Sequence, residues 1–292
     1  MTEESVGKVL EHNWDDLSPI EQDDGPHPVA SIAYTDDYKT MMGYLRRVME
    51  INELSARCFD LTTALIDMNP AHYTIWEYRR RILEQLGAKE DLKWLDEATI
   101  EHSKNYQIWH HRQSIRYDDD ESYYKHEYEI TQQVILDDTK HYHAWTHLQW
   151  LMKQRLGSVF KLEDELDFVN KLLDLDVYNN SAWNYRYFLL HKELTNKEVL
   201  DGEREYVENK IALAPQNEAP WNYLAGIFEK EYPQTLMTVA EKYSDKSIHG
   251  MEVLARLKRK DDHEAARTLY SRLEELNPVR KGYWRYMKAG LA

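Results

Sequence analysis

The stretch KNYQIWHHRQ (residues 104–113) returns in altered form as KHYHAWTHLQ (residues 140–149). Lysine, tyrosine, tryptophan, histidine and glutamine occupy the same places in both stretches. Three further stretches match when the chain is aligned on tryptophan: HYTIWEYRR (72–80), NNSAWNYRY (179–187) and NEAPWNYLA (217–225). The chain therefore repeats one unit at least five times.

A tryptophan marks the same position in each repeat. The five tryptophans are Trp76, Trp109, Trp145, Trp183 and Trp221, at intervals of 33, 36, 38 and 38 residues. Trp284 follows 63 residues after the fifth, which leaves room for one degenerate repeat between them. A period of this length is typical of a solenoid of stacked repeats, in which the tryptophans fill the core.

Apolar residues at helical spacing precede each tryptophan. In KLEDELDFVNKLLDLD (161–176), for example, Phe168, Leu172 and Leu175 recur at intervals of three and four. A short polar break with capping residues, such as Asn179, then comes before the tryptophan helix. Each repeat is thus predicted to be a helical hairpin. The expected fold class is all-α, a right-handed superhelix (α-α solenoid) of hairpin repeats that forms a crescent over residues 34–292.

The start of the chain lacks this period. The stretch DDLSPIEQDDGPHPVAS (15–31) is rich in Asp, Pro and Ser, which predicts an irregular N-terminal arm over residues 1–33. Because the first 22 residues show no apolar period, we expect their deletion to leave function nearly unchanged.

Charge and composition argue against several classes of protein. The formal net charge of −15 argues against a nucleic-acid partner, because such binding depends on clustered Lys and Arg. The single cysteine excludes an internal disulfide and a cysteine-rich metal cluster. No apolar run approaches the ~20 residues that span a bilayer, and the start MTEESVGKVL does not resemble a signal peptide. A cytoplasmic location is expected.

Chemistry-bearing side chains gather where two tryptophan helices are predicted to start. Lys104 and Tyr106 lie there in one repeat, and Lys140, Tyr142 and His143 lie there in the next. Matching positions of stacked hairpins are roughly 10 Å apart, so the two groups should share a surface. Helix N-termini with ammonium, phenol and imidazole donors suit a phosphate or a carboxylate. The alternative is that the lysines are merely solvated and the tyrosines pack.

Other site patterns are weaker. His143 and His147 have the i, i+4 spacing of a metal pair, but the stretch HAWTH has no glutamate at the metalloprotease position and a core tryptophan between the histidines. The chain is therefore expected to bind no metal. A phosphate-binding glycine loop, a dinucleotide-binding glycine pattern and a nucleophile arrangement are also absent from the sequence. Taken alone, the chain lacks the parts of a complete enzyme.

Taken together, these repeats and the N-terminal arm resemble a known protein family. DDGPHPVASIAYTDDYKTMMGYLRRV (23–48), NPAHYTIWEYRRRIL (69–83) and the repeats that follow are similar to the alpha subunit shared by protein farnesyltransferase and geranylgeranyltransferase type I. The resemblance extends over about residues 23–228. It implies a heterodimer with a beta subunit that holds the catalytic zinc, and magnesium in the farnesyl reaction. The implied activity is transfer of a farnesyl or geranylgeranyl group from its diphosphate to the cysteine of a C-terminal CaaX sequence.

The resemblance also implies roles at the isoprenoid end of the site. Lys104 matches the lysine that contacts the isoprenoid diphosphate, and Tyr106 matches a tyrosine of the isoprenoid wall. Tyr142 and His143 match the tyrosine and histidine at the diphosphate end. Lys104, Tyr142 and His143 are therefore the expected catalytic residues of this chain.

At the peptide end, Gln107 matches the glutamine that holds the terminal carboxylate of the CaaX peptide, and Tyr73 lies beside its last side chain. Arg112 matches a repeat arginine with a structural role. Two positions depart from the family. His141 stands in place of asparagine, which puts a polar contact there in doubt, and Leu148 stands in place of arginine, which predicts a missing ion pair.

Two alternatives remain from the sequence. One is the alpha subunit of Rab geranylgeranyltransferase, which tends to have F-H-C-W where this chain has Y-H-A-W (142–145). The other is a noncatalytic tetratricopeptide-like scaffold, against which the drift of the period from 33 to 38 residues argues. The choice of beta subunit, prenyl chain length and protein substrate depends on the partner.

Overall fold

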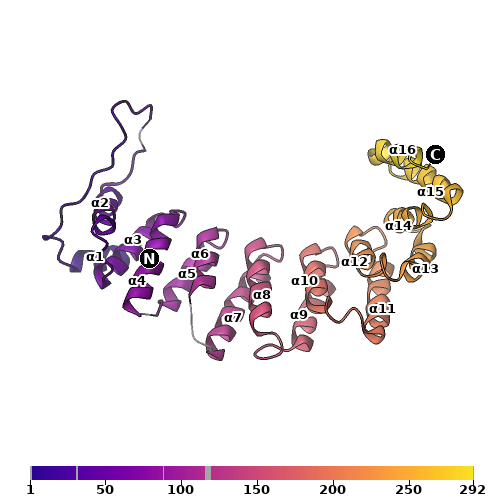
Figure 1. The fold of residues 1–292 in the computed structure, drawn as a ribbon, viewed down its shortest axis with the longest axis horizontal. Coiled ribbons are helices and arrows are strands. Elements are labelled where there is room, and N and C mark those ends of the chain that lie inside the picture. Colours follow the sequence, from indigo (N-terminus) through magenta and orange to yellow (C-terminus); the bar gives the residue numbers. More distant parts are fainter. Residues whose placement is uncertain (1, 31, 88, 116–119, 292) are drawn as a thin grey trace. The chain divides into compact units, whose positions relative to one another are not determined.

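The computed structural model describes residues 2–30, 32–87, 89–115 and 120–291. These ranges contain sixteen α-helices, one short 3₁₀ helix and no β-strand (Figure 1). The expectation of an all-α fold built from helical hairpins is confirmed. Within the same ranges, no helix has both the length and the apolar character needed to cross a membrane.

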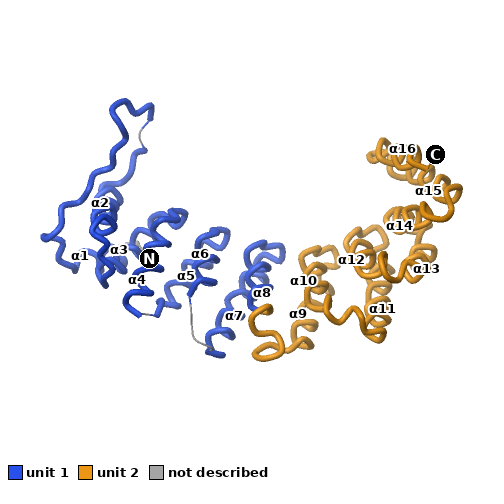
Figure 2. Tube along the Cα trace, in the orientation of Figure 1, with its two compact units in different colours: residues 1–151 blue, residues 152–292 orange. Residues whose placement is uncertain are grey.

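The chain forms two compact units, Met1–Leu151 and Met152–Ala292 (Figure 2). The helices that begin in the first unit are α1 (Thr2–Glu11), α2 (Asp36–Glu50), α3 (Ala56–Met68), α4 (Tyr73–Leu86), α5 (Leu92–Glu101), α6 (Tyr106–Ser114), α7 (Glu121–Asp137) and α8 (Tyr142–Arg155). Those of the second are α9 (Leu162–Leu175), α10 (Asn180–Leu190), α11 (Lys197–Leu213), α12 (Glu218–Phe228), α13 (Pro233–Tyr243), α14 (Ile248–Lys258), α15 (His263–Leu276), the 3₁₀ helix Pro278–Arg280 and α16 (Lys281–Ala289).

The repeat tryptophans are buried, as predicted, and they also hold the turns of the hairpins. In four repeats the indole N–H donates to the backbone carbonyl six residues earlier, between the two helices of the hairpin. The pairs are Trp76 with Pro70 (2.8 Å), Trp109 with Ser103 (2.5 Å), Trp145 with Thr139 (3.0 Å) and Trp183 with Val177 (2.9 Å). Each indole thus fills the core and satisfies a backbone carbonyl in the turn between the two helices.

The starts of the tryptophan helices follow the capping residues of the sequence. Asn105, Asn179 and Asn217 are the N-caps of α6, α10 and α12, and each side-chain oxygen accepts a hydrogen bond from a backbone N–H of the first turn. In each case the tryptophan is four residues beyond the cap. This fixed offset places the buried ring identically in every repeat.

The degenerate repeat lies in α13 and α14. Ser247 caps α14, and Met251, four residues further, occupies the position of the tryptophan and is 1% exposed. Trp284 on α16 is buried against Tyr270 of α15, with ring centroids 6.4 Å apart. The hairpin pattern therefore continues to the C-terminal helices of the second unit.

The N-terminal arm differs from the irregular segment expected over residues 1–33. Residues Thr2–Glu11 form α1, which packs against α3 and buries Val9. Ser5 Oγ donates to Asp67 Oδ2 over 2.7 Å, and His12 Nε2 lies 2.7 Å from Asp60 Oδ2. The apolar period was missed because only Val6, Val9 and Leu10 carry it over a short helix.

The rest of the arm, up to the N-cap Thr35 of α2, has no helix among its described residues. It is nevertheless tied down, because the Arg57 guanidinium on α3 pairs with Asp16 over 2.7 Å and donates to the backbone carbonyl of Asn13 over 2.8 Å. Deleting residues 1–22 would remove α1 and these contacts of Arg57, so the structure predicts a loss of stability where the sequence predicted a nearly neutral outcome.

Two adjacent residues of α1 test this packing. Val9 is 3% exposed and Leu10 is 74% exposed. Val9→Ala should lower the free energy of unfolding by about 2 kcal/mol, because it removes buried methyl groups and leaves a cavity. Leu10→Ala, the matched control, should change it by less than about 0.5 kcal/mol. Urea unfolding of the two variants measures both, and equal effects would show that α1 is not docked in solution.

Candidate functional site

The first residues of three successive tryptophan helices form a row of exposed tyrosines. Tyr73 begins α4, Tyr106 begins α6 and Tyr142 begins α8, and they are 69%, 70% and 69% exposed. The tryptophan three residues further along each helix is buried. Large aromatic side chains exposed at equivalent places indicate a surface for binding rather than for the core.

Lys104, Tyr106, Tyr142 and His143 come together between the starts of α6 and α8. The Tyr106 ring meets the His143 ring edge-on, with centroids 4.2 Å apart, and His143 meets Tyr142 in the same way at 5.3 Å. Lys104 Nζ lies 3.3 Å from Asp138 Oδ2, in the turn before α8, and its side chain is 80% exposed. The two groups of residues therefore share one surface, as their spacing predicted.

The residues expected to bind the peptide lie nearby on the same helices. Gln107 is half-buried beside Tyr106 in the first turn of α6, where its backbone N–H donates to Asn105 Oδ1 over 2.8 Å. Tyr73 lies one repeat earlier at the start of α4, with its ring 6.3 Å from that of His72. The residues predicted to bind the two substrates thus lie at the starts of α4, α6 and α8.

Two histidines of this surface are held in the neutral form. Burial lowers the pKa of His143 below its usual value. Burial also lowers the pKa of His141, although the Asp138 carboxylate opposes this shift. His141 Nδ1 accepts a hydrogen bond from Ala144 N over 3.2 Å, so the imidazole replaces the capping amide of an asparagine. Within the group of Lys104, Tyr106, Tyr142 and His143, the positive charge at neutral pH is therefore carried by Lys104.

Beneath the surface, a buried carboxylate joins successive tryptophan helices. Arg79 on α4 donates from Nε to Glu90 Oε2 over 2.7 Å, and His111 Nε2 on α6 lies 2.7 Å from the same oxygen. Burial alone would raise the pKa of Glu90, but the Arg79 charge and the hydrogen bonds from His111 and Arg79 outweigh it and lower the pKa to about 2. Burial lowers the pKa of His111, which therefore donates as a neutral imidazole.

The same arrangement recurs in the next repeat. Arg112 on α6 pairs with Glu127 Oε1 on α7 over 2.5 Å, and His147 Nε2 on α8 lies 2.9 Å from Glu127 Oε2. All three side chains are buried, so the structural role expected for Arg112 agrees with its contacts. The His147 ring nitrogen faces the Glu127 carboxylate, and this contact explains the buried histidine as a structural residue of the repeat. Among the described residues there is no group of three or more His, Cys, Asp or Glu side chains that could hold a metal ion.

The substitution at position 148 changes this pattern. Leu148 occupies the place of the repeat arginine on α8 and is fully buried, so it contributes no charge to a carboxylate. In the second unit the pattern returns with tyrosine in place of histidine. Arg186 Nε donates to Glu203 Oε2 over 2.9 Å, and Tyr223 OH donates to the same oxygen over 2.6 Å.

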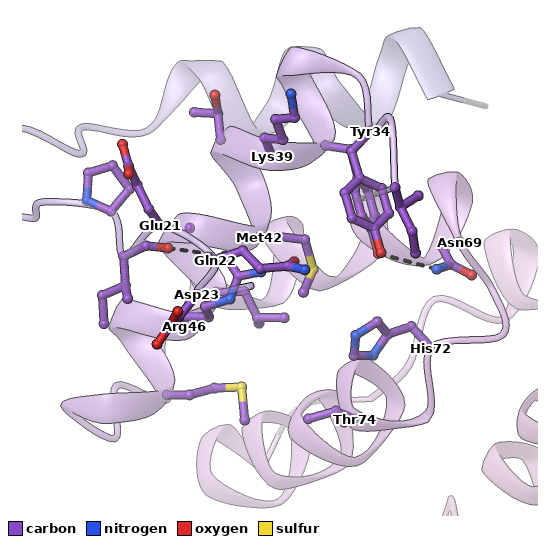
Figure 3. Close-up of a pocket in the computed structure, with 18 of the residues that line it drawn as sticks. Glu21, Gln22, Asp23, Tyr34, Lys39, Met42, Arg46, Asn69, His72 and Thr74 are labelled. Carbon is purple, nitrogen blue, oxygen red and sulfur yellow. Dashed lines mark hydrogen bonds between the residues drawn. The ribbon is translucent and has the colours of Figure 1, made fainter. Parts of the chain in front are cut away.

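A pocket with a cavity volume of about 830 Å³ lies away from these residues, in the first unit. It is lined by the extended stretch 19–24, by α2 and by the loop between α3 and α4, where Asn69 and His72 face it (Figure 3). Of the predicted site residues, none lines it, although its wall includes Thr74 next to Tyr73. The predicted site residues thus form an open row of side chains on helix ends, distinct from this pocket.

Sequence reasoning missed three residues that organise the site. Glu90 and Glu127 were not singled out, because a lone glutamate in a helical repeat is usually solvated and only its buried partners reveal it. Asp138 was also missed, although it precedes KHYHAW by two residues and so occupies a fixed place in the repeat. Its partner, Lys104, is 34 residues away, a separation that local patterns do not resolve.

Comparison with known proteins gives the class of this chain. The model of the protein prenyltransferase alpha subunit repeat matches residues 55–86, 88–117, 124–155 and 162–193. A chain in the solved structure of Candida albicans protein geranylgeranyltransferase-I complexed with GGPP is 31% identical with a TM-score of 0.84, over 97% of this chain and 99% of that one. The chain belongs to the protein prenyltransferase alpha-subunit family.

Curated relatives refine the placement within the family. The protein farnesyltransferase/geranylgeranyltransferase type-1 subunit alpha of Schizosaccharomyces pombe is 50% identical over 101 residues, which is 34% of each chain. The same subunit of Solanum lycopersicum is 44% identical over 94 residues, 32% of this chain and 27% of that one. A geranylgeranyl transferase type-2 subunit alpha, from Dictyostelium discoideum, is 34% identical over 107 residues, 33% of each chain. These matches thus span a quarter to a third of the curated relatives.

The buried carboxylate of Glu90 should make the stability of the chain depend on pH. Because its pKa is depressed to about 2, its contribution is present above pH ~4.5 and is lost as the pH falls towards 2, an effect on the order of 3 kcal/mol. The lowered pKa of His111 acts in the same direction, since the unfolded chain takes up that proton first as the pH falls below its usual value. Stability should therefore decrease on acidification.

Glu90→Gln should lower the free energy of unfolding at pH 7 by about 3 kcal/mol, because it leaves the Arg79 charge buried without a carboxylate. In a His111→Gln background, which removes the imidazole whose pKa depends on Glu90, Glu90→Gln should also reduce the loss of stability between pH ~4.5 and pH ~3. Urea unfolding at several pH values measures both effects. The control is Glu97→Gln, an exposed position on α5 that should follow the wild type. Parallel pH profiles with and without Glu90→Gln in the His111→Gln background would contradict the assignment.

Proposed function

We propose that this chain is the alpha subunit of a heterodimeric CaaX protein prenyltransferase. The complex would transfer farnesyl or geranylgeranyl from its diphosphate to a cysteine thiolate near the C-terminus of a protein. The observation that carries the proposal is the group formed by the exposed Lys104, Tyr106 and Tyr142 with the half-buried His143 at the starts of α6 and α8. Membership of the alpha-subunit family supports it.

The chemistry of transfer explains why these residue types suit the surface. When the thiolate attacks C1 of the isoprenoid, the bond to the diphosphate breaks and negative charge grows on the departing oxygens. The exposed Lys104 ammonium supplies a charge-assisted donor, and the N-terminal turns of α6 and α8 add the positive ends of their dipoles. Tyr142 and the neutral His143 add donors at the same end, while Tyr106 forms part of the isoprenoid wall.

The peptide substrate is proposed to lie along the same row of helix starts. Gln107, one residue beyond Tyr106, would donate from its amide to the terminal carboxylate of the CaaX peptide. The exposed ring of Tyr73 would lie beside the last side chain of the peptide. The two substrates would then meet at the start of α6.

The remaining components are proposed to come from the partner. The beta subunit would hold the zinc that activates the thiol, and magnesium would accompany the diphosphate in the farnesyl reaction. The exposed tyrosines are aromatic surface of the kind that a partner covers, which supports a heterodimer. A cytoplasmic location, where the buried Cys58 thiol would stay reduced, completes the proposal.

Lys104→Ala tests the role of the ammonium. The substitution removes one donor from the departing diphosphate, so the single-turnover rate of the heterodimer should fall about 100-fold. Isoprenoid affinity should fall less, because the contact strengthens as charge develops in the transition state. Lys140→Ala is the matched control, at the same place in the next repeat, and should be nearly silent. Equal rates for Lys104→Ala and the wild type would refute the assignment.

The peptide role of Gln107 predicts a different kinetic signature. Gln107→Ala should raise the apparent KM for a CaaX peptide and leave isoprenoid affinity almost unchanged, because the amide contacts only the peptide carboxylate. Steady-state kinetics with a fluorescent CaaX peptide measures the first quantity, and equilibrium titration with the isoprenoid diphosphate measures the second. A lower isoprenoid affinity with normal peptide KM would assign Gln107 to the other substrate.

The division of labour is tested by purification. Zinc and prenylation activity should follow the beta subunit, and the chain alone should have neither. Mass spectrometry of the proteins that copurify with the native chain would identify the partner. Stoichiometric zinc and prenylation of a CaaX peptide by the isolated chain would refute the proposal, and modification of Rab proteins in place of CaaX peptides would favour a type-2 subunit.

A further inference from the structure

The ion pair between Lys104 and Asp138 connects two repeats at the proposed diphosphate site. Lys104 lies just before the N-cap of α6, and Asp138 is the C-cap residue of α7, in the turn that leads to α8. Lys104 Nζ and Asp138 Oδ2 are 3.3 Å apart. The pair therefore brings the ammonium towards the start of α8, where Tyr142 and His143 lie.

Asp138 is held firmly, whereas Lys104 is not. Asp138 Oδ1 accepts from Lys140 N over 3.1 Å, its own N–H donates to Val134 O over 3.0 Å, and its carbonyl accepts from His141 N over 3.0 Å. The hydrogen bond from Lys140 N, together with Lys104, keeps the pKa of Asp138 below its usual value, against the effect of burial. The carboxylate is thus a charged, fixed acceptor.

Lys104 has the opposite character. Its side chain is 80% exposed and has four rotatable bonds, so an isolated ammonium at this position would populate many rotamers. An ammonium has three donors, and Asp138 engages one of them. The remaining donors stay available for an anionic ligand at the starts of α6 and α8.

We propose that Asp138 is a positioning residue, which holds the Lys104 ammonium at the place where the diphosphate of the isoprenoid departs. The inference rests on the proposed function and adds to it a residue that touches neither substrate. Because both oxygens of Asp138 are engaged, one by a backbone N–H and one by Lys104, the carboxylate orders the lysine and does not present a free oxygen to the diphosphate. For this role, the benefit of ordering the lysine must exceed the repulsion between the carboxylate and the diphosphate, and the rate of an Asp138→Asn variant measures this balance.

The charge of Asp138 can be removed without altering its turn. Asn at position 138 has the same shape, and its side-chain oxygen still accepts from Lys140 N. Asp138→Asn in the heterodimer should lower the single-turnover rate with farnesyl or geranylgeranyl diphosphate about threefold at low salt, the size expected for an exposed ion pair. The apparent KM for the CaaX peptide should not change. Asp138→Glu, which keeps the charge, should restore part of the rate.

Two further readouts separate positioning from a general effect on structure. In a Lys104→Ala background, Asp138→Asn should have no additional effect, because its action requires the lysine. The ratio of wild-type to Asp138→Asn rates should also approach one as the ionic strength rises towards 1 M, because exposed pairs are screened. Asp176→Asn is the matched control: Asp176 Oδ1 accepts from Tyr178 N over 2.9 Å in the corresponding turn after α9.

The outcomes distinguish this inference from the proposed function. If Lys104→Ala is slow and Asp138→Asn equals the wild type or is faster, the positioning role is overturned and the proposed function stands. If Asp138→Asn is equally harmful with and without Lys104, Asp138 acts by another route and the inference fails. If Lys104→Ala itself is silent, the proposed role of the lysine fails, and the inference fails with it. Thermal unfolding and heterodimer yield verify that each variant is folded.

Discussion

A buried carboxylate shared between an arginine of one repeat and a histidine of the next is the interaction on which the site depends. Glu90 joins Arg79 on α4 to His111 on α6, and Glu127 joins Arg112 on α6 to His147 on α8. A carboxylate placed in the interior without these partners would cost several kcal/mol, so the helices are stable only where all three groups meet. This requirement fixes the offset of α4, α6 and α8 along their axes.

The surface chemistry follows from that offset. Because the tryptophan helices are held in register, their first residues come to one side, and Tyr73, Tyr106 and Tyr142 form an exposed row. Within each helix the first residue is available for binding, whereas the fourth, the tryptophan, closes the hairpin through its indole. One repeated unit thus provides both the buried scaffold and the proposed site. The repeats still differ at single positions: Asn105 caps α6, for example, whereas His141 takes the capping position before α8.

Sequence patterns predicted the hairpins and the placing of the candidate site residues at helix starts, because both depend on local order. The tryptophan period predicted the repeats and the asparagine caps predicted the helix starts, whereas the anion site expected from the position of Lys104 before a helix stays a prediction. Contacts between residues distant in sequence were not predictable in the same way. Asp138 becomes a partner of Lys104, and Glu90 a buried acid, only once the hairpins stack. The docking of α1 likewise joins Val9, Ser5 and His12 to residues of α3 about fifty to sixty positions away.

The hydrogen-bonded indoles have a spectroscopic consequence. In four repeats a buried tryptophan donates to the turn of its own hairpin, whereas the buried indole N–H groups of Trp221 and Trp284 have no acceptor among the described residues. Indole fluorescence shifts to longer wavelength when the ring becomes hydrated, and each ring here reports on one hairpin. Variants that keep a single repeat tryptophan, with phenylalanine at the other eight tryptophans of the chain, would therefore make the opening of each hairpin separately visible, so that unfolding could be followed repeat by repeat.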